Sequence, residues 1–262
     1  MSRSVDSPPV SFDSDPDPNP GAGTGAAPDS GAETPPSLDA LRQALQKAPS
    51  LLDGIDGAPP EPLRPLPQMA LSRGRVHEAT GRSRRRLAAL AAGAAQPEGP
   101  VMWLRPAWRI ESLYPYGMLT LMPDPGALIF VACPKPVDIL WCMEEALRAG
   151  CVSLVVAEIV GMPDLRQVRR LHLAAAEGLA RNRRAGRISP APLGLMLEAE
   201  RAQSRVPGVE SRWALHPLPG PEGVTPVGRW RLERQLARGE PPRDWDILET
   251  RLPSGAPGRE RA

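Results

Sequence analysis

Short apolar runs recur along the middle of the chain and have the length of buried β-strands. The clearest are "PVMWL" (100–104), "ALIFVAC" (127–133) and "VSLVVAE" (152–158). Each is almost apolar throughout, which is typical of strands that are covered on both faces. Further strands are predicted at "RVHEAT" (75–80) and "PLGLMLEAE" (192–200).

Between these runs the apolar positions follow a helical period. One helix is predicted over 83–95. A second is predicted from Pro136, since proline suits the first helical position, to a stop at Gly150. Its apolar face is expected to consist of Ile139, Leu140, Met143 and Leu147. A third helix is predicted to begin near Pro163.

The alternation of apolar strands with helices predicts an α/β fold with a mostly parallel sheet flanked by helices on both faces. Two later runs, "ESRWALHP" (210–217) and "RWRLERQLAR" (229–238), are predicted to form an antiparallel hairpin. This C-terminal hairpin is expected to extend one edge of the sheet.

Composition divides the chain further. The first 37 residues contain eight prolines and six acidic residues, with too few large apolar groups to offset the entropy of folding. After them, Leu38, Leu41 and Leu45 recur at helical spacing. The predicted segments are a disordered tail at 1–37, a short amphipathic helix within 38–53, a proline-rich linker at 54–68, a core at 69–238 and a flexible tail at 239–262.

Charge, cysteine spacing and the length of the apolar runs indicate which classes of protein the sequence does not fit. The net charge is +2, and because the N-terminal tail is acidic, the core is more basic than the average. Cys133, Cys142 and Cys151 show neither the spacing of a zinc site nor that of a disulfide framework. No run approaches the ~20 apolar residues that cross a bilayer. We therefore expect a soluble cytoplasmic protein without membrane contact.

One turn lies where an α/β fold binds phosphate, between the strand and helix of "VHEATGRSRRRLAALAAG" (76–93). A nucleotide-binding P-loop has the pattern G-x-x-x-x-G-K-[ST]. With Gly81 as the first glycine, every functional position is lost. With Gly81 as the second, Arg82 and Ser83 mimic the lysine and hydroxyl, but Val76 replaces the first glycine. Neither register provides a phosphate cradle.

We therefore predict a degenerate nucleotide site formed by Gly81, Arg82, Ser83 and Glu158, with no catalytic residues, cofactor or metal. Glu158 ends a predicted strand, where a P-loop protein carries its Mg²⁺-side carboxylate. The simpler interpretation is a solvated acid at a strand end. The three histidines, His77, His172 and His216, are expected on helix or strand surfaces.

Arginines gather in two places and form candidate phosphate or DNA contacts. They are Arg84, Arg85 and Arg86 after the turn, and Arg166, Arg169 and Arg170 on the third helix. A solvated surface explains them equally well. They are not interleaved with aromatic residues in the sequence, so no base-stacking platform is predicted.

The second helix offers candidate partner contacts. Trp141, if exposed, would be a natural anchor for a protein partner, with Glu144 and Glu145 beside it. The simpler interpretation places Trp141 in the core between helix and sheet. It also places Glu144 and Glu145 on a solvated face.

Several of these runs together resemble the ImuA family, RecA-like accessory proteins of SOS mutagenesis. The resemblance covers about 69–238 and is most specific at 128–177. The runs that carry it are "GRVHEATG" (74–81), "PVMWLRPAW" (100–108), "LYPYGM" (113–118), "LIFVACPKPVDILWCMEEALRAGCVSLVVAEI" (128–159), "RRLHLAAAE" (169–177) and "VESRW…WRLER" (209–234).

The run "ILWCMEEALRAGCVSLVVAEI" (139–159) also resembles RecA, which implies a RecA-like core. The sequence differs from RecA at the positions that would bind and hydrolyse ATP. Its P-loop is shortened and lacks the lysine, and "RPAW" (105–108) replaces the carboxylate expected after the second strand. The stretch "AERAQSRVPG" (199–208) is short where RecA has a long DNA-contacting loop.

The ImuA resemblance implies a non-catalytic adaptor in damage-induced translesion DNA synthesis. The implied partners are an ImuB-like inactive Y-family polymerase homologue and an error-prone homologue of the replicative polymerase α-subunit, with RecA and weakly bound, non-specific DNA as further candidates. Two alternatives remain open. One is an ATP-binding or ATP-hydrolysing RecA-like protein whose P-loop is rebuilt with arginine, and the other is a cell-division inhibitor of the SulA type.

Overall fold

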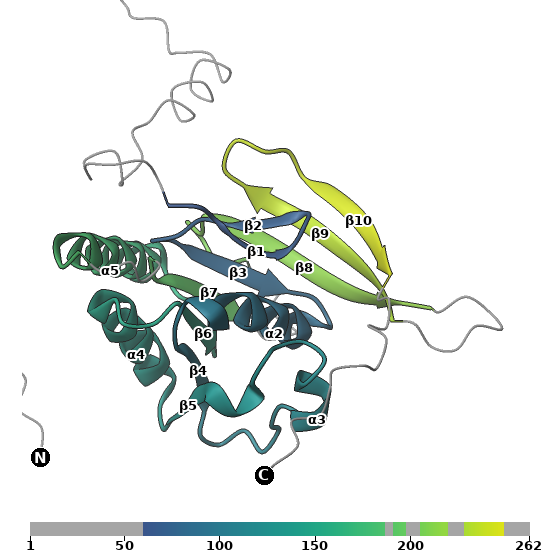
Figure 1. The fold of residues 1–262 in the computed structure, drawn as a ribbon, viewed down its shortest axis with the longest axis horizontal. Coiled ribbons are helices and arrows are strands. Elements are labelled where there is room, and N and C mark those ends of the chain that lie inside the picture. The colour runs from purple at the N-terminus through teal and green to yellow at the C-terminus, as the bar shows by residue number, and fades with distance from the viewer. Residues whose placement is uncertain (1–59, 187–190, 198–204, 220–227, 249–262) are drawn as a thin grey trace, which may run out of the picture. The chain divides into compact units, whose positions relative to one another are not determined.

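The computed structural model describes residues 60–186, 191–197, 205–219 and 228–248. Within them the chain forms an α/β fold around a central sheet (Figure 1). The predicted disordered tail at 1–37 and the predicted helix within 38–53 lie outside the described residues. The first part of the predicted linker (54–59) and the last part of the predicted C-terminal tail (249–262) also lie outside them. The same holds for most of the short stretch at 199–208.

The central sheet has eight strands in the order β10-β9-β8-β3-β7-β6-β4-β5. The neighbours from β8 to β5 pair in parallel, whereas β9 and β10 are antiparallel. This confirms the predicted mostly parallel sheet and the pairing of the two last predicted runs. The strands are β3 (Val76–Thr80), β4 (Val101–Pro106), β5 (Leu128–Cys133), β6 (Leu154–Glu158), β7 (Leu193–Leu197), β8 (Ser211–Leu218), β9 (Arg229–Ala237) and β10 (Arg243–Leu248).

Strands also form where a linker and a tail were predicted. A hairpin of β1 (Leu63–Leu66) and β2 (Met69–Leu71) begins inside the proline-rich segment, because Leu63, Met69 and Leu71 are buried in the core and Leu66 packs against it. At the other end β10 lies inside the predicted flexible tail. Its Trp245 and Ile247 pack on the same cluster, and this burial orders the strand.

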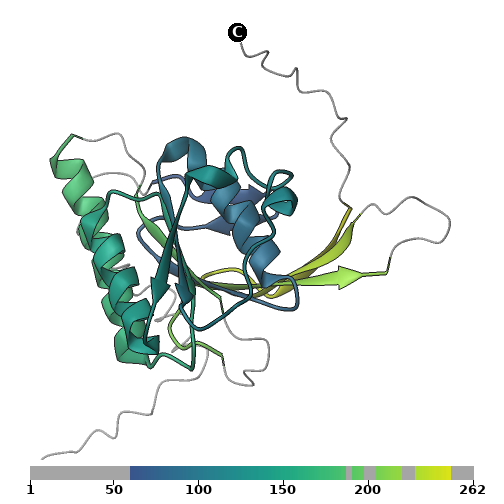
Figure 2. The same cartoon turned by 90° about the horizontal axis from the view of Figure 1, so that it is seen from below.

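Helices cover both faces of the sheet, as predicted. Helix α2 (Arg84–Ala95) packs on one face, and α4 (Pro136–Ala149) and α5 (Leu165–Arg184) pack together on the other (Figure 2). Helix α4 ends at Gly150, whose left-handed φ of 69° confirms the predicted stop. None of the described helices is long and apolar enough to cross a membrane.

A long connection joins β4 to β5 and lies on the α2 face. It contains the short helix α3 (Pro115–Met118) and a 3₁₀ turn, η2 (Pro125–Ala127), while a second 3₁₀ turn, η1 (Gln96–Glu98), follows α2. Met118 and Met122 are buried in the same cluster as α2. Helix α2 also carries Gly93, where a Cβ would approach the Leu121 carbonyl oxygen to 2.2 Å. The connection is therefore held closely against α2.

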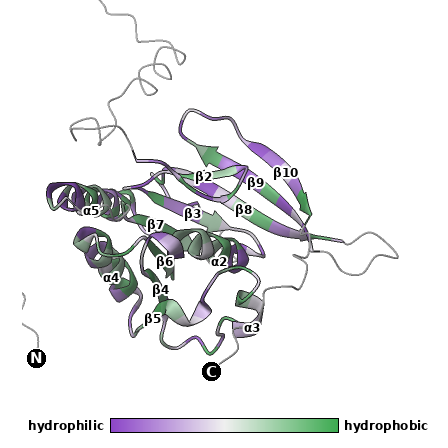
Figure 3. Cartoon of the chain, in the orientation of Figure 1, coloured by the Kyte–Doolittle hydropathy of each residue, from purple (hydrophilic) through white to green (hydrophobic). Residues whose placement is uncertain are grey.

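Strand β5 is the outermost strand on its side, and among the described residues it pairs only with β4. Its Ile129 and Phe130 side chains are exposed, although they belong to a predicted apolar strand. Figure 3 shows the central strands as largely hydrophobic, whereas β10 at the opposite edge is mainly hydrophilic. The two edges of the sheet thus differ in chemistry.

Two histidines expected on the surface are buried instead. The Nε2–H of His77 donates to the Ser72 carbonyl oxygen (3.0 Å), so its Nδ1 accepts from the Ser211 hydroxyl (2.7 Å). His172 accepts from the Val76 backbone N–H and donates to the Gly208 carbonyl oxygen. Burial lowers the pKa of His77 from 6.5 to about 4 and also lowers the pKa of His172. Both rings are therefore neutral near pH 7.

We predict that acid destabilises the protein through His77. The histidine of the unfolded chain binds a proton as pH falls below 6.5, whereas the buried ring resists protonation down to about pH 4. Its contribution to stability is complete above pH 6.5 and is lost between these values, by about 3 kcal/mol. Urea unfolding at successive pH values measures this loss.

The His77→Gln variant should show a flatter decline of unfolding free energy in that window. His216→Gln, outside this hydrogen-bond network, should keep the steeper one. Equal slopes for the native chain and His77→Gln would contradict the assignment.

Candidate functional site

A tight turn connects β3 to α2 at the predicted phosphate position. Only Gly81, Arg82 and Ser83 separate the strand from the helix. Gly81 has a φ of 86°, and a Cβ there would lie 2.6 Å from the carbonyl oxygen of Leu215 on β8. The backbone N–H of Ser83 donates to that same oxygen at 3.0 Å. The turn is thus packed directly against β8.

This packing changes what the turn can bind. In a P-loop, backbone N–H groups of a longer loop point at the phosphates. Here the N–H of Ser83 is used by Leu215, and that of Arg84 contacts the Gly81 carbonyl oxygen at 3.3 Å. The side chain of Ser83 does not cap the helix. The donors that a phosphate would need are therefore directed at the protein's own backbone.

Glu158 is the centre of the site. It ends β6 and is only 5% exposed, so the interpretation as a solvated acid is wrong. Its Oε2 accepts from Arg85 Nη2 at 2.8 Å and from Arg109 Nη1 at 3.4 Å. Its Oε1 accepts from the indole N–H of Trp103 at 3.1 Å. Both carboxylate oxygens are therefore engaged by side chains of the protein.

Arg85 is held by two carboxylates. Besides Glu158, its Nη1 bonds to Glu111 at 3.2 Å. Burial opposes the charge on Arg85, but the hydrogen bonds and attraction of Glu158 and Glu111 outweigh burial, so its pKa is raised. A permanently charged guanidinium thus occupies the space beside the only acidic residue of the predicted nucleotide site.

The sequence placed Arg85 beside the turn, but it did not identify the remaining partners of Glu158. Trp103 lies on β4 and Arg109 follows that strand, 55 and 49 residues away in the chain. They meet Glu158 because β4 is paired with β6 in the sheet. The one available clue was "RPAW" (105–108), where a carboxylate was expected and basic and aromatic residues stand instead.

The other arginines after the turn have separate surroundings. Arg82 is exposed, and Arg84 donates to the Gly81 carbonyl oxygen at 3.3 Å. Arg86 lies over the indole ring of Trp230, 4.6 Å from the ring centroid. The three adjacent arginines of α2 thus contact different groups of the protein.

The arginines of α5 lie on the other face of the sheet (Figure 2). Arg166 and Arg169 are exposed, whereas Arg170 pairs with Glu144 of α4 at 2.8 Å. The two predicted arginine groups are thus carried by helices that cover opposite faces.

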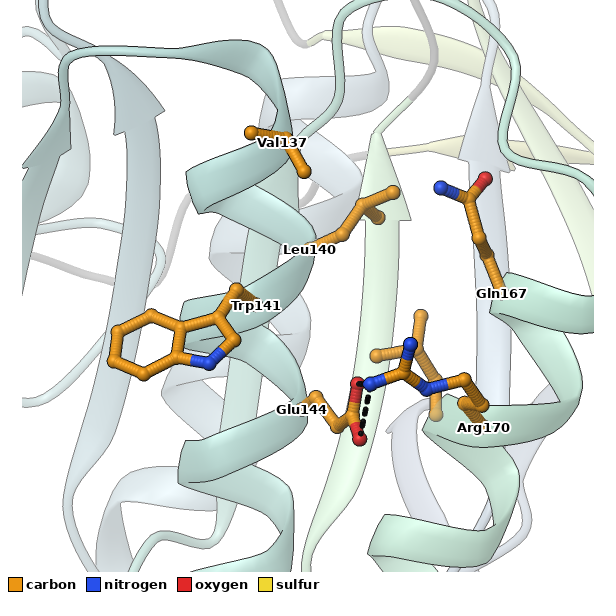
Figure 4. Close-up of a pocket in the computed structure, with 7 residues that line it drawn as sticks. Val137, Leu140, Trp141, Glu144, Gln167 and Arg170 are labelled. Carbon is orange, nitrogen blue, oxygen red and sulfur yellow. Dashed lines mark hydrogen bonds and ion pairs between the residues drawn. The ribbon is translucent and has the colours of Figure 1, made fainter.

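A groove runs between α4 and α5 (Figure 4). It encloses a cavity of about 120 Å³. Trp141 is 61% exposed, so the simpler interpretation, which placed it in the core, is wrong. Figure 4 shows its ring on the side of α4 that faces away from α5. The lining residues are Val137, Leu140, Trp141, Glu144, Gln167, Arg170 and Leu171.

The groove has a fixed polar rim. Glu144 was expected on a solvated face but is buried, and it pairs with Arg148 and Arg170. Burial alone would raise its pKa, but the hydrogen bonds from the two arginines outweigh burial, so the pKa of Glu144 is lowered. Glu145 is exposed and pairs with Arg148. The structure thus brings an exposed indole next to a network of fixed charges.

The sequence matches no protein-family model and no curated protein.

We predict that Arg85→Ala destabilises the fold by about 1–3 kcal/mol, because it leaves a buried carboxylate short of its best charged donor. Urea unfolding with the linear extrapolation measures this change. Arg82→Ala, at an exposed position in the same turn, should change stability by no more than about 0.5 kcal/mol. Equal effects of the two substitutions would show that Glu158 does not depend on Arg85.

Proposed function

We propose that this chain is a non-catalytic, RecA-like adaptor of the ImuA family that acts in damage-induced mutagenic translesion DNA synthesis. The observation that carries the proposal is the engagement of Glu158 by Arg85, Arg109 and Trp103. The sequence resemblance at 128–177 supplies the family.

The closed carboxylate argues for binding rather than turnover. Phosphoryl transfer by a P-loop protein needs a lysine, a backbone cradle and a carboxylate that holds Mg²⁺. In this chain an arginine stands after Gly81, the Ser83 amide bonds to β8, and Glu158 bonds to three side chains. The strand and helix of a nucleotide fold are retained, and their interactions now stabilise the protein itself.

The sheet supports the RecA-like part of the proposal. The turn after β3 and the end of β6 lie at the carboxyl edge of the parallel strands, with β7 between those two strands. This is the edge at which open α/β sheets place their ligands. The degenerate site thus occupies the expected position in the fold while its chemistry has changed.

The α4–α5 groove is the proposed contact for a protein partner. An exposed indole beside apolar Val137 and Leu140 is the kind of anchor that dominates interface energies. The Glu144–Arg170 pair at its side offers charged groups already held in place. We assign the groove to the ImuB-like polymerase homologue, with the polymerase α-subunit homologue joining the same assembly.

We predict that Trp141→Ala weakens binding to a purified ImuB-type protein from the same organism by about 30-fold or more, as loss of an interface hot spot does. Biolayer interferometry with the full chain measures this change. Trp108→Ala removes another exposed indole outside the groove and serves as the matched control.

Partner binding that is lost in Trp108→Ala and kept in Trp141→Ala would refute the assignment of the groove. Absence of binding by the native chain would refute the ImuB-type partner.

We also predict that calorimetric titration of the full chain with Mg²⁺-ATP gives no binding heat up to millimolar nucleotide. The reason is that the Glu158 carboxylate, which would have to hold Mg²⁺, is already paired with Arg85 and Arg109. Binding tighter than ~100 μM, about −5.5 kcal/mol, would show that arginines have rebuilt a nucleotide site. It would overturn the non-catalytic proposal.

A further inference from the structure

The segment that follows β4 presents aromatic rings to solvent. Trp108 is 50% exposed, Tyr114 70% and Tyr116 73%. The two tyrosines are the only ones in the chain, and their ring centroids lie 5.8 Å apart. Each ring carries a large apolar area, and a group of exposed apolar side chains often marks an interaction site. Their concentration on one short segment marks a contact surface.

The structure brings arginines to the same segment. Arg85, from the first turn of α2, bonds to the Glu111 carboxylate at 3.2 Å. Arg105, from β4, donates to the Glu111 carbonyl oxygen at 3.3 Å. Arg109 directly follows Trp108. Glu111 therefore bonds to two of these three guanidinium groups. It precedes Tyr114 in the same segment, so these groups lie beside the aromatic residues.

The net charge of this surface is positive. Arg85 pairs with the carboxylates of Glu111 and Glu158, and Arg109 pairs with that of Glu158. Arg105 donates to the Glu111 carbonyl oxygen, which carries no net charge. Glu158 is almost completely buried, whereas Arg85 and Arg109 each keep about a quarter of their side-chain area exposed. Solvent and ligands thus meet the guanidinium groups and only one of the two carboxylates. A polyanion is the ligand class that complements such a surface.

We propose that this aromatic–arginine surface, formed by Arg85, Arg105, Trp108, Arg109, Tyr114 and Tyr116, binds single-stranded nucleic acid. Exposed bases stack on the rings while phosphates contact the guanidinium groups. A duplex hides the faces of its bases, so the rings select single strands. The binding is independent of nucleotide sequence, since every base has a π-face.

This inference goes beyond the proposed adaptor function and does not depend on it, because it concerns the chain without protein partners. It also reverses a conclusion from the sequence, in which arginines 84–86 are separated from the aromatic residues at 108–116. The contact between Arg85 and Glu111 brings the two groups together.

The test is fluorescence anisotropy of a labelled oligothymidylate of about 20 nucleotides, longer than the ~4–16 nucleotides that one OB-fold covers. The full chain is titrated at low salt and then at increasing salt. We expect saturable binding. With roughly three phosphate contacts at ~0.7 each, log K should fall with log salt at a slope of about −2.

Single substitutions then locate the site. Trp108→Ala, Tyr114→Ala and Tyr116→Ala should each weaken binding by about 5- to 150-fold, the range that corresponds to one stacked base. Arg105→Gln should also reduce the salt slope by about 0.7. Leu173→Ala removes an exposed apolar side chain of α5 that lies outside this surface; it is the control and should bind like the native chain. Circular dichroism confirms that each variant is folded.

Three outcomes would overturn the proposal. The first is a native chain that fails to bind oligothymidylate at low salt. Binding could be unaffected by all three aromatic substitutions and lost instead in an Arg166→Gln, Arg169→Gln variant of α5. Finally, polyglutamate of the same length could bind as tightly and with the same dependence on the three rings, which would assign the surface to an acidic protein segment.

Discussion

The ion pair between buried Glu158 and Arg85 is the interaction on which the arrangement of the site depends. A carboxylate that is removed from water needs charged or hydrogen-bonding partners, and Glu158 takes them from α2, from β4 and from the segment after β4. These contacts fix the first turn of α2 against the carboxyl edge of the sheet. They also hold Arg109, and with it the neighbouring Trp108, at that edge.

The same contacts join two parts of the carboxyl edge of the sheet that are far apart in the sequence. Arg85, in the first turn of α2, bonds to Glu158 at the end of β6, so a guanidinium of the chain itself links the turn after β3 to that strand end. The two proposed binding surfaces then lie on different helical layers, the groove on the α4–α5 face and the aromatic–arginine surface beside α2. Two ligands of different chemistry can therefore be held at once without competing for the same residues.

Local rules predicted the parts of the structure that depend on local sequence. Pro136 and Gly150 bound α4 as expected, and the central apolar runs form the parallel strands. The failures have a common cause, which is contact between residues that are distant in the chain. Prolines concealed the β1–β2 hairpin, and β10 has alternating charges that suggest a tail until Trp245 is seen to stack on Trp213. The burial of His77 and Glu158 likewise follows from strand pairing, which no local pattern encodes.

Among the residues that the structure describes, no strand pairs with the outer side of β5, and this affects how the isolated protein behaves. Natural sheets protect exposed edges with charged residues, prolines or bulges. The six residues "LIFVAC" (128–133) offer none of these, and Ile129 and Phe130 project from the two faces of the strand. An edge of this kind is a template for the sheet of any neighbouring molecule. Colloidal stability, rather than resistance to unfolding, is therefore the property expected to limit the concentration at which the purified chain stays monomeric.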